Sequence, residues 1–185
     1  MISHKEALAL LAENGVEGGL LQHSTASAAV MAALARHFGE DEELWALTGL
    51  LHDVDYPATM HEPQRHGLAA GELLAGRLPE EALTAIRAHN GEMTGVMPQS
   101  RLDYALRCAE TVTGLVGAAA LMRPTGYEGM ESKSIKKKMK DKAFAASVNR
   151  DNIRECEKIG LELDAFLTLV IAAMKAEHDA AQPGA

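Results

Sequence analysis

The stretch Gly49-Leu50-Leu51-His52-Asp53-Val54-Asp55-Tyr56-Pro57 is where a run of apolar residues stops at a histidine followed by an aspartate. The pair offers a neutral nitrogen ligand and an anionic oxygen ligand at the expected last turn of a helix. Unpaired carbonyl groups give a helix C-terminus partial negative charge, and divalent ions such as zinc accept imidazole and carboxylate together. The stretch therefore predicts a cation site. A solvated polar helix end is the alternative if no partner lies elsewhere in the chain.

The composition limits what the chain can be. Its 185 residues, 47% of them hydrophobic, are enough for one domain with a core and too few to favour two. A formal net charge of −8 argues against general binding to nucleic acid or anionic membranes. Cys108 and Cys156 have no CxxC spacing, so we expect reduced, buried thiols. We recognise neither a leader peptide nor a membrane span, and we expect a cytoplasmic protein.

Helical periodicity runs through the chain. Apolar residues recur at three- and four-residue steps, and no segment shows the alternation typical of a strand. Capping residues or a proline mark several helix starts, namely Ser3 with Glu6, Pro79, Ser100 and Asn149. We expect helices at about 3–14, 22–38, 40–52, 66–76, 79–89, 100–122, 131–147, 149–156 and 161–178, with a loop at 91–98. The prediction is an all-α, single-domain helical bundle over 1–178, followed by a disordered tail at 179–185.

Histidines and carboxylates fall on five successive helices of this prediction. They are His23, the His52-Asp53 pair, His66, His89 and Glu110. A helical bundle can point side chains from several helices into one interior site. Sequence spacing alone does not establish that they converge.

Three short contexts in this order carry a resemblance. Gln22-His23-Ser24, the Gly49–Asp53 string and Ala109-Glu110-Thr111-Val112-Thr113-Gly114 resemble the HD-domain superfamily of metal-dependent phosphohydrolases. The chain looks most similar to the small bacterial predicted HD superfamily hydrolases, which share a Leu-His-Asp-x-Asp-Tyr-Pro string and a late lysine-rich segment. The resemblance covers about residues 20–175. It implies an HD-type helical bundle.

In that superfamily a divalent metal is held by a first histidine, the His-Asp pair and a final aspartate. The resemblance carries these roles to His23, His52, Asp53 and Glu110. Glu110 departs from the family pattern, which has aspartate, and the extra methylene shifts its carboxylate relative to the metal.

His66 and His89 resemble the additional histidines of HD subgroups that hold two ions, commonly iron or manganese. The resemblance then implies that His66 and His89 hold the second ion while Asp53 spans both. Imidazole-rich ligation also suits nickel, cobalt or zinc. Two such ions can stabilise the attacking and the leaving oxygen of a displacement at phosphorus.

Asp55 lies two residues past Asp53 and joins it as a catalytic candidate. It is close enough to orient a metal-bound water or a histidine. An Asx-type turn before Tyr56-Pro57 is an equally good interpretation.

The segment 131–147 is dense in lysine, and on a helix most of this charge would be solvated surface. By resemblance to the late segment of the family, Lys140, Lys142 and Arg150 would instead clamp a substrate phosphate. Concentrated positive charge would draw such a substrate inward.

These features lead us to expect a phosphohydrolase that uses a metal-activated water to hydrolyse a phosphate mono- or diester. The expected partner is a nucleotide or related small phosphorylated substrate, with neither a nucleic acid polymer nor a membrane. Two alternatives stay open. One is a two-iron HD-type oxygenase, and the other is a non-catalytic nucleotide- or signal-binding module in which Glu110 has weakened metal binding. The sequence does not indicate the oligomeric state.

Overall fold

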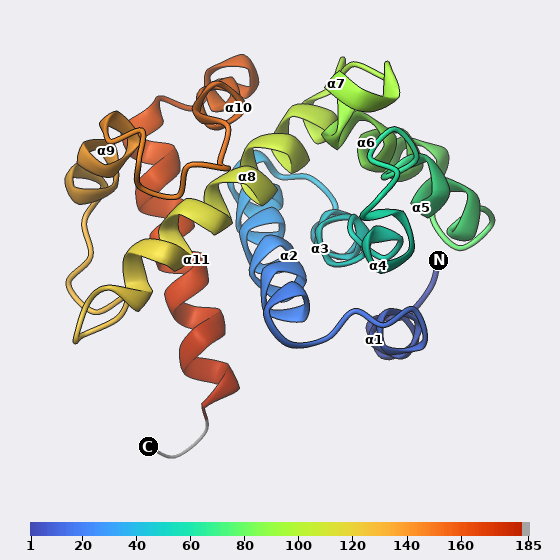
Figure 1. The fold of residues 1–185 in the computed structure, drawn as a ribbon, viewed down its shortest axis with the longest axis horizontal. Coiled ribbons are helices and arrows are strands. Elements are labelled where there is room, and N and C mark those ends of the chain that lie inside the picture. Colours follow the sequence, from blue (N-terminus) through green and yellow to red (C-terminus); the bar gives the residue numbers. More distant parts are fainter. Residues whose placement is uncertain (183–185) are drawn as a thin grey trace.

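The computed structural model of the chain describes residues 1–182, so the end of the expected tail, 183–185, lies outside the described residues. Within them the chain forms eleven α-helices and one 3-10 helix, with no β-strand, which confirms the predicted all-α single domain (Figure 1). The helices are α1 (His4–Glu13), α2 (Gly18–Phe38), α3 (Glu42–Leu51), α4 (Tyr56–Thr59), α5 (Leu68–Leu73), α6 (Glu80–His89), α7 (Gly91–Thr94), α8 (Arg101–Leu121), α9 (Ser132–Lys140), α10 (Arg150–Arg154), η1 (Glu155–Ile159) and α11 (Leu163–Ala181).

The two longest helices, α2 and α8, pack against each other in the middle of the bundle (Figure 1). Helices α1 and α3 to α7 lie on one side of this pair, and α9 and α11 lie on the other. The core between them is apolar, and its largest fully buried side chains include Met31, Leu51, Leu106, Leu115 and Phe166. Among the described residues, no helix combines the length and the apolar character that crossing a membrane requires.

The contact between α2 and α3 is unusually close because Gly49 has no side chain. A Cβ atom placed there would lie 2.8 Å from the backbone oxygen of Ser27. Ser27 is one turn after His23 on α2, and His52 is three residues after Gly49 at the end of α3. The close approach of the two backbones therefore brings these two histidines within reach of each other.

Capping signals set several helix ends as predicted. Capping boxes start α1 at Ser3 and α8 at Ser100, and the Asn149 side chain accepts a hydrogen bond at the start of α10. Helix α3 ends at Leu51, directly before the His52-Asp53 pair.

Other boundaries were predicted wrongly. Helix α2 already begins at Gly18, and α5 covers only 68–73 because Gly67, with φ 88°, turns the chain before it. The expected loop at 91–98 contains the short helix α7. Helix α9 ends at Lys140 because Asp141 is extended, so Lys142 lies in a loop. Helix α11 continues to Ala181, which makes residues 179–181 helical rather than disordered.

Candidate metal centre

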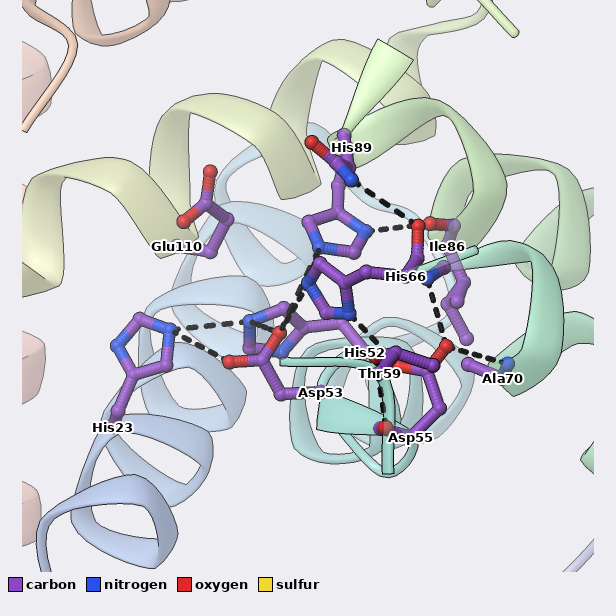
Figure 2. Close-up of polar contacts among 12 residues, drawn as sticks. His23, His52, Asp53, Asp55, Thr59, His66, Ala70, Ile86, His89 and Glu110 are labelled. Carbon is purple, nitrogen blue, oxygen red and sulfur yellow. Dashed lines mark hydrogen bonds and ion pairs between the residues drawn. The ribbon is translucent and has the colours of Figure 1, made fainter. Parts of the chain in front are cut away.

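Four histidine rings surround the carboxylate of Asp53 (Figure 2). Its Oδ1 atom lies 3.3 Å from Nε2 of His52 and 3.2 Å from Nε2 of His66. The same oxygen is 3.6 Å from Nε2 of His89, while Oδ2 is 3.6 Å from Nε2 of His23. The structure thus brings together five of the six residues expected to bind metal.

These residues form two groups that share Asp53. His23, His52 and Asp53 make one group, and Asp53, His66 and His89 make the other. In each group, one ligand atom from every residue lies within 4.8 Å of the others. These are the same two sets of residues that the resemblance implied, and their binding of two ions stays a prediction.

The Nδ1 atom of each of the four rings has a fixed hydrogen-bond acceptor, and for two rings this is a backbone carbonyl oxygen. Nδ1 of His52 lies 2.8 Å from the carbonyl oxygen of Gly49, and Nδ1 of His89 lies 2.5 Å from that of Ile86. A carbonyl oxygen can only accept a hydrogen bond, so both Nδ1 atoms carry the proton. In the neutral ring the lone pair is then on Nε2, which faces Asp53.

His23 is fixed in the same way by Thr113, which is not among the predicted site residues. The Thr113 hydroxyl donates to the backbone oxygen of Glu110 at 2.6 Å, which leaves its own oxygen to accept from Nδ1 of His23 at 3.0 Å. Thr113 lies one helical turn from Glu110, and this spacing is the only signal in the sequence that points to it.

The Nε2 atoms of the four rings face each other in two pairs across the cluster. Nε2 of His23 lies 3.1 Å from Nε2 of His52, and Nε2 of His66 lies 3.0 Å from Nε2 of His89. Two lone pairs at this separation repel unless a proton or a cation lies against both. A divalent cation turns each pair into joint ligands, and imidazole with carboxylate is a donor set that transition metals accept. The residues present fit such an ion.

Burial controls the charge on His52. Because the ring is fully buried, the loss of solvent lowers its pKa to about 3, although the neighbouring Asp53 charge works in the opposite direction. His52 is therefore neutral at physiological pH, with Nε2 free to bind a metal.

Hydrogen bonds and nearby charges determine the ionisation of Asp53 and His66, which lie beside His52. Burial alone would raise the pKa of Asp53, but His52 and hydrogen bonds from His66 and His89 hold it well below its usual range. Burial disfavours the charged form of His66, yet hydrogen bonds to Asp53 and Asp55 raise its pKa to about 9. A metal ion binding to His66 would displace its proton.

Asp55 is buried and holds His66 in place (Figure 2). Its Oδ1 accepts from Nδ1 of His66 at 2.9 Å, and its Oδ2 accepts from the backbone N–H groups of Gly67 and Ala70 at 2.8 and 2.9 Å. This carboxylate orients a histidine and caps the start of α5. The Asx-turn interpretation is wrong, since an Asx turn would need an N–H on Pro57, which proline lacks.

Glu110 lies beside the cluster but belongs to neither group of potential ligands. Its carboxylate accepts a hydrogen bond from the Thr111 hydroxyl, and Figure 2 draws no contact from it to a histidine. Burial raises its pKa, while the nearby His89 and His23 act to lower it. Its role as a ligand stays a prediction.

The three residues expected to clamp phosphate do not meet at the cluster. Among the described residues, no hydrogen bond or ion pair connects Lys140, Lys142 or Arg150 to it. The Arg150 guanidinium instead donates to the carbonyl oxygens of its own loop. Its acceptors are Ala145 at 2.7 Å, Asp141 at 3.3 Å, Phe144 and Val148. Phosphate binding by these three residues stays a prediction.

Comparison with known families identifies the fold around this site. The HD domain family matches residues 20–116, just over half of the chain and the part that contains His23 to Glu110. The chain belongs to the HD domain family. HD domains bind divalent metals, and this HD domain has two groups of residues that could hold one.

One similar curated protein is Ribonuclease Y of Desulfotalea psychrophila, which is 30% identical over 159 residues. The match covers 82% of this HD domain chain and 29% of that relative, so the chain spans less than a third of its length. No solved structure matched the chain. Membership of the HD domain family and the His/Asp cluster together fit a metal-dependent phosphohydrolase.

Proposed function

We propose that this HD domain hydrolyses a phosphate ester in a nucleotide or a related small phosphorylated metabolite. The observation that carries the proposal is the pair of opposed Nε2 atoms on either side of one shared carboxylate. Such an arrangement suits two neighbouring divalent ions. Many enzymes that catalyse displacement at phosphorus use two metal ions in this way.

His23 and His52 would hold one ion, His66 and His89 the other, and Asp53 would bridge them. Iron or manganese suits these nitrogen-rich positions, as nickel, cobalt and zinc also do. Bound ions supply Lewis-acid stabilisation of phosphoryl oxygens and lower the pKa of the attacking water. Glu110 would join the first position only by exchanging its hydrogen bond with Thr111 for the metal.

The chain's own residues determine where a substrate can approach. The side chain of His23 is 24% exposed, whereas that of His52 is fully buried and that of His89 is 5% exposed. Solvent therefore reaches the cluster past His23. In the proposed reaction, Asp53 stays ionised because of its low pKa. Asp55 fixes the orientation of the His66 ring through the hydrogen bond that it accepts from Nδ1.

A small substrate is favoured over a polymer by the net charge of −8, which repels an extended polyanion. The name of the similar relative, Ribonuclease Y, makes RNA the appropriate competitor in an activity screen. The screen should thus compare phosphate monoesters, small diesters and a short RNA.

The decisive experiment measures metal content and phosphate release in the full chain. Wild-type protein should carry about two transition-metal ions per chain and release phosphate from at least one substrate class. Asp53→Asn, which preserves the side-chain shape, should lose both. His61→Gln, at an exposed histidine outside the cluster, is the matched control and should lose neither.

Other outcomes would contradict the proposal. Undiminished phosphatase activity in metal-free Asp53→Asn protein would exclude the cluster as the site of reaction. Oxygen consumption with an organic substrate would favour a two-iron oxygenase. Tight nucleotide binding without turnover, in protein that retains no metal, would favour a non-catalytic binding module.

A further inference from the structure

A pocket is lined by residues of α9, α10 and α11. Figure 1 shows α9 and α11 on the side of the molecule away from α4 and α6. The pocket has a volume of about 440 Å³, and its lining is mostly basic. The lining residues are Lys133, Lys136, Lys137, Met139, Lys140, Arg154 and Leu163. None of them belongs to the metal groups.

The four lysines form one stripe on α9. They stand at positions i, i+3, i+4 and i+7, which share a face of an α-helix, and Arg154 of α10 faces the same pocket. The stripe from Lys133 to Lys140 extends over about 10 Å at the helical rise of 1.5 Å per residue. The lysines of this face thus line the pocket together with the guanidinium of Arg154 from a second helix.

Most of this charge has no internal counterion. Lys136 pairs with Asp164 at the start of α11, but no carboxylate of the described residues is within ion-pair distance of Lys133, Lys137, Lys140 or Arg154. This contrasts with Arg36, Arg65, Arg87, Arg101, Arg107, Lys158 and Lys175, which all have acidic partners. A chain with 26 acidic residues thus leaves four cations unpaired at one pocket.

Helix stability alone does not account for the stripe. Lys137 and Lys140 in the last turn of α9 interact favourably with the helix dipole. Lys133, in the first turn, meets the positive end of that dipole, and the N-cap Glu131 is the acidic residue at this helix start. Lys133 and Lys137 are also a like-charge pair at i,i+4, which disfavours the helix. An anion in the pocket would relieve both.

The lining indicates which anion fits. Of the described residues that line the pocket, none is aromatic, so it offers no ring for stacking a base. Three unpaired lysines spread over about 10 Å of α9, with Arg154 lining the same pocket, suit several linked phosphates better than a single small anion. We propose that this pocket binds the polyphosphate group of a small ligand, such as inorganic triphosphate or the tail of a nucleoside triphosphate, at a site separate from the metal centre.

The proposal can be tested without any activity. Inorganic triphosphate is titrated into the full chain by calorimetry at low ionic strength with excess EDTA, so that the metal centre is empty. Saturable binding of one triphosphate per chain is expected, weakening steeply with added salt. An equivalent concentration of sulfate, matched in ionic strength, should bind far more weakly.

Charge reversal locates the binding. Lys137→Glu should weaken triphosphate binding by about tenfold, and Arg154→Glu on the facing helix should do likewise. Lys5→Glu on α1 changes the net charge by the same amount at an exposed position remote from the pocket and should have little effect. All three sites are exposed, so circular dichroism should show intact helices in each variant.

Equal weakening by Lys5→Glu and Lys137→Glu, or no saturable triphosphate binding by wild type, would overturn the proposal. So would a short single-stranded RNA that binds where triphosphate does not. The metal content of Lys137→Glu should equal that of wild type, which keeps this test independent of the phosphohydrolase proposal.

Discussion

The Asp55 carboxylate divides its two oxygens between a histidine ring and the first turn of a helix. Asp55→Asn keeps the size of the side chain but replaces one acceptor oxygen with an NH₂ donor, and it removes the negative charge that favours the N–H of His66. Partners of metal-bound histidines typically contribute a factor of 10–100 in metal affinity. We expect Asp55→Asn to lose about one of two ions, that of the His66 and His89 position, as measured by metal analysis.

Asp41→Asn is the matched control for that variant. Asp41 also caps a helix, accepting from the backbone N–H of Leu44, but it has no contact with the cluster among the described residues. Asparagine caps helices as well as aspartate does, so both ions should remain. Equal metal loss in Asp41→Asn and Asp55→Asn would show that helix capping, rather than the orientation of His66, explains the effect.

Some residues of the site could be predicted from the sequence and others could not. His52 and Asp53 could be predicted because a polar pair after an apolar run marks a helix end near the core. The hydrogen bond between Thr113 and His23 and the direction of the Glu110 side chain could not, since they depend on how α8 is rotated against α2. Helix rotation is set by packing of the whole face, and no short motif encodes it.

At the scale of elements, the close contact between α2 and α3 predicts that a side chain at Gly49 destabilises the fold. Gly49→Ala would place a Cβ atom 2.8 Å from the Ser27 backbone oxygen, which cannot move without shifting α2. Overpacking of this kind typically costs about 1–3 kcal/mol, and the gain in helix propensity offsets only part of it. Urea unfolding of the metal-free protein should show a net loss of about 1–2 kcal/mol.

Gly19→Ala provides the matched comparison. Gly19 is an exposed helical residue of α2, and a Cβ there would meet nothing within 4 Å. Its substitution should leave stability unchanged or raise it by about 0.5–1 kcal/mol. If Gly49→Ala proved as stable as Gly19→Ala, the close backbone contact would not be what sets the distance between α2 and α3.

The packing of η1 against α8 protects the two cysteines. Cys108 on α8 and Cys156 on η1 are both fully buried. Burial raises the pKa of Cys156 to about 12, and burial raises that of Cys108 well above its usual range. A raised pKa keeps each thiol protonated, so little of the reactive thiolate forms even at pH 9.

Native protein should therefore react very slowly with Ellman's reagent at pH 8 to 9, and both thiols should react at once in denaturant. Rapid reaction of the native chain would contradict the buried positions of these residues. A reaction rate that follows the unfolding rate would support them.

Helix ends agreed with the prediction where a neighbouring residue caps the helix. They differed from it where residues distant in sequence determine the end. Ser3 and Ser100 cap their own helices and were predicted. The start of α5 depends on Asp55, twelve residues before Gly67. The end of α9 adjoins a loop whose carbonyl groups are bound by Arg150. Local periodicity contains no information about such partners.

On the scale of the whole molecule, the cluster joins elements that are distant in sequence. His23 comes from α2, the His52-Asp53 pair follows α3, and His89 ends α6. These segments bring the Nε2 atoms together in two pairs, 3.1 and 3.0 Å apart, so that one ion can bind both nitrogens of a pair. An ion that binds only the folded chain stabilises it by about 4 kcal/mol when its free concentration is 1,000 times Kd.

Chelation should thus destabilise the whole domain and not only the site. For a chain of 185 residues, 1 kcal/mol corresponds to about 2–4 °C in Tm, so EDTA should lower the Tm of metal-loaded protein by on the order of 10 °C. Calorimetry should show one cooperative transition before and after chelation, because the ligands come from helices packed on a single core. Asp53→Asn, which lacks the shared ligand, should melt at the same temperature with and without EDTA. An equal drop in that variant would mean that the chelator acts elsewhere, and an unchanged wild-type Tm would mean that the cluster holds no tightly bound ion.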